Sequence, residues 1–244
     1  IPIIFSHVDA FMQIVVEEKV PIVFTSAGNP MKWTHFLKEK GIKVAHVVAN
    51  TKGAKKCEEA GCDAIVAEGF EAGGHNGKEE TTTMVLIPMI KDAVTLPLIA
   101  AGGIASGRAM LATMALGSEG VQIGSRFIAS LESSAHQLFK EKILETKEGD
   151  TFYAMKKLVG VRLLNNQFAQ KIYELENNGA DVEKISELLG RGRAKKGMYE
   201  GDLVEGELEL GQVAAAINKI QAVADIFEEI ITEYNSELKK LTNI

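Results

Sequence analysis

The chain has 244 residues, and with 46% of them hydrophobic it can bury the core of one large domain or of one domain with a cap. The formal net charge of −6, with acidic and basic residues interspersed, argues against a surface that binds nucleic acid. No apolar run approaches the length of about 20 residues that crosses a bilayer, so we expect no membrane segment.

Short β-rich runs alternate with helical patterns along the first half of the chain. This alternation predicts a parallel sheet, because parallel strands need a crossover helix between them. The expected strands cover residues 3–5, 21–24, 43–48, 64–67, 97–100 and 120–123. The expected helices cover residues 10–18, 31–40, 52–60, 84–93 and 107–116. A spacing of about 20 to 30 residues between strands is typical of a (β/α)8 barrel or a doubly wound sheet.

The six expected βα units are two fewer than a closed eight-stranded barrel contains. The chain also begins on a strand pattern at Ile1 without an initiator methionine. We therefore expect an α/β fold, a (β/α)8 TIM barrel that lacks its first two βα units in this chain. Strands three to eight of that barrel would occupy residues 1–130.

Helix formers dominate the sequence from Ser130 onward. Apolar residues recur at helical spacing over 172–189 and 214–241, and Asn177-Asn178-Gly179 and Gly190-Arg191-Gly192 interrupt the pattern. We expect a helical cap or insertion over residues 131–212. A C-terminal helix that packs on the barrel would follow within residues 213–244.

Two successive strands of the expected barrel end in glycine-containing turns. Gly102 and Gly103 follow the strand counted as seventh, and Gly124 and Ser125 follow the eighth. In this fold the loops after strands seven and eight commonly bind phosphate. Glycine lets an anion approach the backbone N–H groups at a helix start, and a serine hydroxyl adds a donor. These residues therefore predict a phosphate site rather than two simple turns.

A glycine-rich loop with one histidine follows the strand counted as sixth. His75 is flanked by Gly73, Gly74 and Gly77, at the end of the sheet where barrel enzymes place their reacting groups. Because an imidazole exchanges protons near neutral pH, we expect His75 to be catalytic. Glu68 closes the same strand, either as a hydrogen-bond acceptor for ligand hydroxyls or as a solvated charge.

The two cysteines, Cys57 and Cys62, are five residues apart. This spacing fits neither a metal-binding C-x-x-C pair nor a disulfide framework. We therefore expect a reduced, cytoplasmic protein with no metal site.

The segments 68–77, 100–104 and 122–127 resemble the signature loops of the FMN-dependent nitronate monooxygenase family, formerly called 2-nitropropane dioxygenases. The family also contains the enoyl-acyl-carrier-protein reductase II enzymes, and the resemblance extends over residues 20–135. It implies a barrel that binds FMN at the carboxyl ends of its strands, with His75 as the catalytic residue. The implied cofactor-binding residues are Gly102, Gly103, Gly124 and Ser125 for the FMN phosphate, and Glu68, Ala72 and Gly73 for the ribityl chain or the ring.

The resemblance implies two activities, and the sequence leaves both open. One is oxidation of a nitronate or nitroalkane with molecular oxygen. The other is reduction of an enoyl thioester, with NADH or NADPH as co-substrate and acyl carrier protein as partner. A barrel without flavin that binds a phosphorylated metabolite is a third hypothesis. In each case the ligand is a small molecule, and a homodimer is compatible with the sequence.

Overall fold

The computed structural model describes residues 1–242, and the chain divides into two compact units. The first unit comprises Ile1–Gly69, Thr81–Ala101 and Thr113–Gln122. The second unit comprises Phe70–Glu80, Gly102–Ala112 and Ile123–Ile244. The last two residues of the expected C-terminal segment, 243 and 244, lie outside the described residues. Within residues 1–242, no helix has both the length and the apolar character that crossing a membrane requires.

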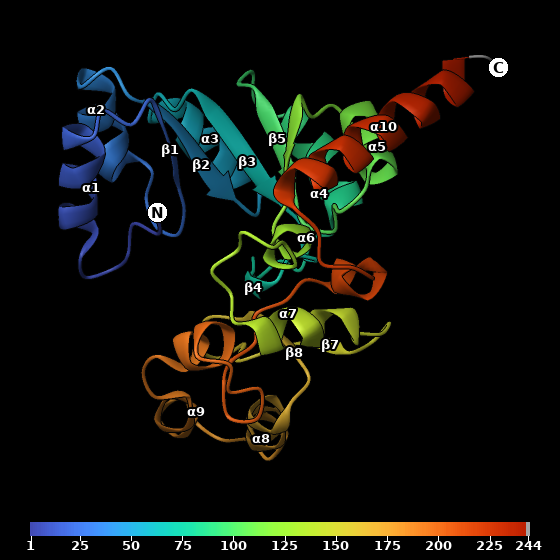
Figure 1. The fold of residues 1–244 in the computed structure, drawn as a ribbon. Coiled ribbons are helices and arrows are strands. Elements are labelled where there is room, and N and C mark those ends of the chain that lie inside the picture. The colour runs from blue at the N-terminus through green and yellow to red at the C-terminus, as the bar shows by residue number, and fades with distance from the viewer. Residues whose placement is uncertain (243–244) are drawn as a thin grey trace. The chain divides into compact units, whose positions relative to one another are not determined.

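The first unit is built on a five-stranded parallel sheet (Figure 1). Its strands, in spatial order, are β1 (Ile22–Thr25), β2 (Lys43–Val48), β3 (Ala64–Glu68), β5 (Leu98–Ala101) and β6 (Gly120–Gln122). Each strand pairs in parallel with the strand that follows it in the first unit. The carboxyl ends of all five strands therefore lie at one edge of the sheet, as the alternating sequence pattern predicted.

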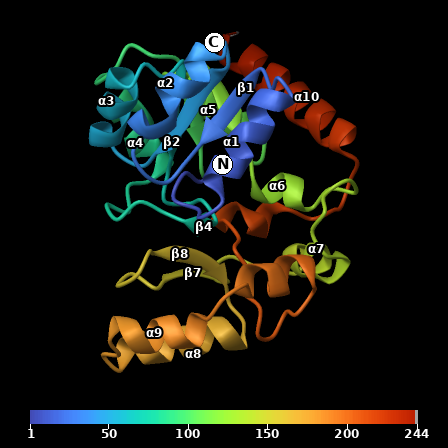
Figure 2. The same ribbon diagram turned by 90° about the vertical axis from the view of Figure 1, so that its left-hand side faces the viewer.

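One helix precedes the first strand of the first unit, and further helices separate the strands (Figure 2). They are α1 (Val8–Glu17), α2 (Met31–Glu39), α3 (Thr51–Glu59) and α4 (Thr83–Lys91), while α5 (Gly107–Ala115) begins in the second unit. Leu37, Ala54 and Leu86 are fully buried or nearly so, because each lies on the face of its helix that packs toward the sheet. The start of α3 is capped by Asn50, whose side chain accepts a hydrogen bond from the Gly53 nitrogen at 2.8 Å.

The parallel sheet is curled rather than flat. Phe24 of β1 and Gly120 of β6 line the same hollow of about 350 Å3, although their strands stand at opposite ends of the strand order. Ala45, Val66 and Ala101 form a core cluster on the three strands between them. This curvature is that of a partial barrel, so the predicted α/β barrel fold is confirmed.

The strand expected over residues 3–5 was wrong. Pro2 alone forms an isolated parallel bridge, with Ser26, and the chain then turns. A proline cannot donate a ladder hydrogen bond, and the apolar run is too short to continue the pairing. Ile4 and Phe5 are exposed instead of lying in a sheet. Within residues 1–242 the parallel sheet therefore has five strands rather than the six that were expected.

The second unit contains a small antiparallel sheet. Its strands, in spatial order, are β4 (Gly74–His75), β8 (Val161–Leu164) and β7 (Thr151–Ala154). The helices are α6 (Ser125–Ile128), α7 (Gln137–Leu144), α8 (Gln167–Asn177), α9 (Val182–Leu189) and α10 (Val223–Thr242), with a π-helical turn η1 (Lys195–Tyr199) and a 3-10 turn η2 (Gln212–Ala216). Helical structure was predicted within residues 172–189 and 214–241, whereas the strands β4, β7 and β8 were not predicted.

Strand β8 lies between two apolar clusters of the second unit. Leu163 packs in one cluster with Phe168 and Ile172 of α8, and Leu164 packs in the other with Phe139 of α7 and Leu210. Helices α8 and α9 lie side by side on one side of the small sheet (Figures 1 and 2). Because all four residues of β8 are buried, its sequence does not alternate between apolar and polar residues.

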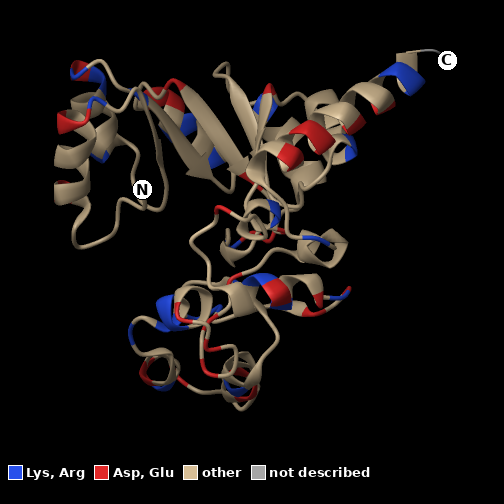
Figure 3. Ribbon diagram, in the orientation of Figure 1, with Lys and Arg blue, Asp and Glu red and all other residues tan. Residues whose placement is uncertain are grey.

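Charge on the last helix follows the helix dipole. Asp225 lies in the first turn of α10, and Lys239 and Lys240 lie in the last turn. Figure 3 shows basic residues, in blue, near the C-terminal end of this helix. Acidic side chains near a helix start and basic ones near its end are each worth about 0.3–1 kcal/mol. This arrangement stabilises a helix of 20 residues.

Candidate active site

The glycine-rich loop that precedes β4 is held by the backbone that leads into η2. The Gln212 nitrogen donates a hydrogen bond of 3.0 Å to the Glu71 carbonyl oxygen. A Cβ atom at Gly73 would lie only 2.5 Å from the Gly211 nitrogen. Since real side chains do not approach backbone atoms so closely, this packing requires glycine at position 73.

The start of α6 joins the same loop cluster. Ser125 is buried, and its Oγ accepts a hydrogen bond of 3.0 Å from the Gly211 nitrogen. This bond uses the hydroxyl oxygen as acceptor, so the hydroxyl hydrogen can still be donated. A Cβ atom at Gly124, the residue before α6, would meet no other atom within 4 Å, so there is open space beside the backbone at that position.

The turn after β5 approaches the loop from another part of the chain. Gly102 and Gly103 have φ values of +90° and +71°, in the left-handed region that favours glycine. A Cβ atom at Gly103 would lie 3.2 Å from the Cβ atom of Glu71. The turn thus packs closely against the side chain of a loop residue.

Three of the residues predicted from the sequence are therefore brought together within the second unit. Gly73, Gly103 and Ser125 meet around Glu71 and Gly211, which we call the glycine cluster. Neither Glu71 nor Gly211 was among the predicted site residues. These two residues belong to the cluster because separate segments of the chain approach each other there. No local sequence pattern indicates this.

A buried arginine fixes the beginning of the loop. The guanidinium group of Arg162, in β8, donates two hydrogen bonds of 3.1 and 2.9 Å to the Phe70 carbonyl oxygen. Its central carbon also lies 4.5 Å from the centre of the Phe70 ring. Burial lowers the pKa of Arg162, and the negative charge of Glu71 acts in the opposite direction. Arg162 is a third residue of this region that was not among the predicted site residues.

His75 forms the end of the loop, in β4, where it pairs with Val161. Its side chain is exposed and can meet a small molecule directly. The Asn76 amide donates hydrogen bonds of 2.9 Å to the Ala72 carbonyl and 3.1 Å to the Gly74 carbonyl. These two bonds fix the backbone on both sides of the glycine pair that leads into His75.

Glu68 is the last residue of β3 and belongs to the first unit. The Gly69 nitrogen that follows it donates a hydrogen bond of 2.9 Å to the Ala101 carbonyl, which extends the pairing of β3 with β5. Burial raises the pKa of Glu68 to about 7. Near neutral pH this carboxyl group can therefore act as a donor or as an acceptor toward a hydroxyl group.

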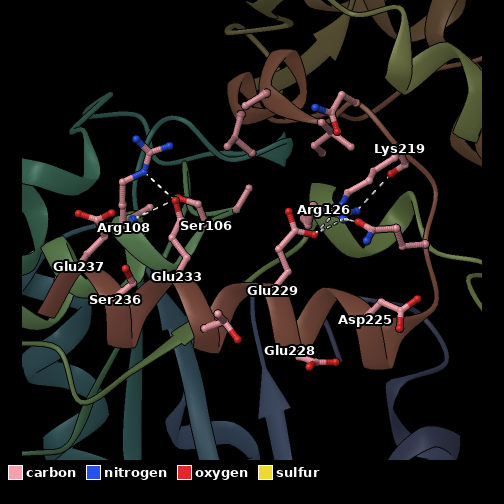
Figure 4. Close-up of a pocket in the computed structure, with 18 of the residues that line it drawn as sticks. Ser106, Arg108, Arg126, Lys219, Asp225, Glu228, Glu229, Glu233, Ser236 and Glu237 are labelled. Atoms are coloured by element: carbon pink, nitrogen blue, oxygen red, sulfur yellow. Dashed lines mark hydrogen bonds and ion pairs between the residues drawn. The ribbon is translucent and has the colours of Figure 1, made fainter. Parts of the chain in front are cut away.

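Arg108 and Arg126 lie in a groove of about 840 Å3 along α10 (Figure 4). The Arg108 Nε lies 2.7 Å from a carboxylate oxygen of Glu233. Arg126 is buried, donates a hydrogen bond to the Gln221 side chain, and lies 3.9 Å from Glu229. Both guanidinium groups are thus engaged by partners in this groove.

The curled parallel sheet, its intervening helices and the glycine turns that follow its strands define an α/β-barrel protein. Residues 6–233 match the family model described as nitronate monooxygenase. The chain therefore belongs to the nitronate monooxygenase family, and the resemblance found in the sequence is confirmed. The family consists of flavin-dependent oxidoreductases.

Individual relatives agree with this assignment. A probable nitronate monooxygenase of Staphylococcus saprophyticus is 33% identical over 241 residues, which are 94% of this chain and 67% of that protein. One from Staphylococcus aureus is 37% identical over 193 residues, covering 75% of this chain and 53% of that protein, so the match spans about half of that relative. The solved structure of FabK from Thermotoga maritima has 43% sequence identity and a TM-score of 0.94, and the match covers 100% of this chain and 77% of that one.

Proposed function

We propose that the full-length protein is an FMN-dependent oxidoreductase that reduces the carbon–carbon double bond of an enoyl thioester, as enoyl-acyl-carrier-protein reductase II does. The similarity to FabK carries this proposal, because FabK is a reductase of that type and the match extends over the whole chain. The acyl chain would arrive on acyl carrier protein, and NADH or NADPH would be the reductant.

The glycine cluster fits the phosphate end of FMN. Glycine at positions 73 and 103 lets backbone segments approach closely, and open space adjoins the backbone at Gly124. The Ser125 hydroxyl can still donate a hydrogen bond. When bound, FMN supplies hydride transfer between a nicotinamide and the substrate. The residues that would hold its phosphate are Gly102, Gly103, Gly124 and Ser125, and those along the ribityl chain or the ring are Glu68, Ala72 and Gly73.

His75 would act as the proton donor of the reduction. Its exposed imidazole lies at the end of a loop whose backbone is fixed by Asn76. As the β-carbon of the enoyl thioester accepts a hydride, the α-carbon needs a proton, and an imidazole can give one near neutral pH. A general acid of this kind contributes about 10²–10⁴-fold to the rate.

Nitronate oxidation is the second candidate, because the curated relatives are named probable nitronate monooxygenases. In this reaction His75 would act as a base rather than as an acid. His75 would accept the proton from the carbon next to the nitro group, or stabilise the nitronate anion that results.

The spectrum and two activity assays of the full-length protein test these proposals. We expect flavin absorbance, loss of NADH or NADPH absorbance with a crotonyl thioester, and slower oxygen uptake with a nitronate. Faster oxygen uptake with the nitronate would favour the second candidate. A colourless protein that FMN cannot reconstitute would exclude both and leave a barrel that binds a phosphorylated metabolite.

The role of His75 has its own test. We expect His75→Gln to lower the rate by about 100-fold or more, because the general acid is removed. The bound flavin should remain, because the glycine cluster is unchanged. His35, an exposed histidine of α2, provides the matched control, and His35→Gln should keep the parent rate. Parent activity in His75→Gln would show that the proton comes from another group.

A further inference from the structure

Two segments follow one another along the same edge of β8. His75 and Gly74 of β4 pair with Val161 and Arg162, and an isolated antiparallel bridge joins Leu163 to Glu209. The other edge of β8 is occupied over its whole length by β7. The backbone at Glu209 therefore continues the edge pairing from the point where β4 stops.

The pairing also places His75 and Glu209 on one face of this sheet. Side chains alternate between the two faces along a strand, and directly paired residues point to the same face. Val161 and Leu163 are two residues apart, so their partners His75 and Glu209 share a face. Two residues along a strand correspond to about 7 Å, which a glutamate side chain can largely span toward an imidazole.

The carboxyl group of Glu209 lies against the residue directly before His75. A Cβ atom at Gly74 would lie 2.6 Å from the Glu209 Oε2. Gly74 also has a φ of +79°, so both its conformation and the nearby carboxyl group favour glycine. The Glu209 carboxyl thus occupies the space beside the backbone that carries the imidazole.

Few charges act on this carboxyl group. Burial raises the pKa of Glu209, and the charge of His75, from β4, lowers it. From its own segment, Glu207 repels Glu209, and burial raises the pKa of Glu207 to about 7. Arg162 pairs with Gly74, and its guanidinium group binds the Phe70 carbonyl oxygen.

We propose that Glu209 is a positioning residue for His75, a carboxylate that pairs electrostatically with the imidazole and orients it for proton transfer. A carboxylate beside an imidazole restricts the orientation of the ring. The role of this pair in catalysis rests on the proposed function of His75. The existence of the charge pair does not depend on that function.

Carbon-13 NMR of the full chain labelled at glutamate Cδ tests the pairing without flavin or substrate. The Glu209 signal is assigned by its loss in Glu209→Gln. In His75→Gln, the titration of Glu209 should shift to higher pH, because the positive charge that stabilises its carboxylate is gone. The signal of Glu39, an exposed residue of α2, serves as the internal control and should keep its parent titration. An unshifted Glu209 titration in His75→Gln, or in His75→Asn if the first variant fails to fold, overturns the proposal.

The pH dependence of the rate separates positioning from simple packing. In Glu209→Gln the pH profile of kcat/KM should change shape, because the imidazole loses its charge partner. Glu39→Gln removes an exposed carboxyl group of α2 and should retain the parent profile. A uniform fall in rate with the parent profile would mean that Glu209 only packs. If the protein lacks the proposed activity, the NMR result still decides whether the pair exists.

Discussion

At the scale of single residues, Gly73 determines whether two distant segments can meet. Its Cα approaches the Gly211 nitrogen so closely that an added Cβ would lie 2.5 Å away. We expect Gly73→Ala to lower the free energy of unfolding by about 1–3 kcal/mol, because the loop must move away from its partner. Urea denaturation followed by circular dichroism measures this change.

Gly120 offers a matched control for that substitution. A Cβ atom there would meet no atom within 4 Å. Gly120→Ala should therefore leave the free energy of unfolding within about 0.5 kcal/mol of the parent value. Equal losses in the two variants would mean that the close approach at Gly73 does not decide the stability of the loop.

Residue identity and local pattern predicted part of the glycine cluster. Gly73, Gly103 and Ser125 could be proposed because glycine and serine after a strand have a local meaning in barrel proteins. Glu71 and Gly211 could not, because their contacts join positions that are far apart in the chain. A sequence read without homologues contains the local signals and lacks these long-range contacts.

At the scale of secondary-structure elements, Asn166 connects a helix to a distant loop. Its side chain caps α8 by accepting a hydrogen bond of 2.9 Å from the Ala169 nitrogen. Its amide also donates to the Leu203 and Gly206 carbonyls at 2.9 and 2.8 Å. We expect Asn166→Ala to cost about 2–3 kcal/mol, from the lost cap and two lost hydrogen bonds, as measured by urea denaturation.

Two further variants show which of these bonds matter. Asp181 only caps α9, so Asp181→Ala should cost about 1 kcal/mol. Asn166→Asp keeps the cap acceptor but directs a carboxylate at two carbonyl oxygens, so it should be as destabilising as Asn166→Ala at neutral pH. Full stability of Asn166→Asp would show that the amide donors contribute nothing.

Secondary-structure elements could be predicted where the spacing of apolar residues and the glycines at helix ends indicated the same boundaries. The strand–helix alternation of the parallel sheet was predicted correctly for β1, β2, β3, β5 and β6. Glycines such as Gly41 and Gly61, both at φ +76°, end the helices between these strands. Strands β7 and β8 were missed because each has only four residues, and buried β8 does not alternate in polarity. The strand expected over residues 3–5 was wrong because an apolar run of three residues does not by itself form a strand. The bridge in this segment is at the preceding residue, Pro2.

At the scale of the whole molecule, buried titratable groups make stability depend on pH in opposite directions. Burial raises the pKa of Glu68 and of Glu207 to about 7, above the ordinary value of 4.5, so the folded chain binds protons more readily there than the unfolded chain. These groups therefore add stability as the pH falls from 7 toward 4.5. His46, in β2, acts the other way, because burial lowers its pKa from 6.5 to about 4.

His46 should therefore make the first unit sensitive to acid. It is 2% exposed and shares a hydrogen bond of 2.7 Å with the Thr25 hydroxyl. In the unfolded chain His46 becomes protonated below pH 6.5. In the folded chain it becomes protonated only near pH 4, because burial lowers its pKa. Stability is then lost across that window, by about 3 kcal/mol at most. Above pH 6.5 the group has no effect of this kind, because both states hold it neutral.

Urea midpoints of the parent and of His46→Gln, measured from pH 7 to pH 4, isolate this contribution from that of the carboxyl groups. At pH 7 the variant should be less stable than the parent, because glutamine replaces a well-packed imidazole. The difference should shrink or reverse as the pH falls, since only the parent loses the stability that depends on a neutral His46. His35→Gln, at an exposed position, should follow the parent throughout. Parallel curves for the parent and His46→Gln would mean that His46 accepts a proton in the folded state as easily as in the unfolded one.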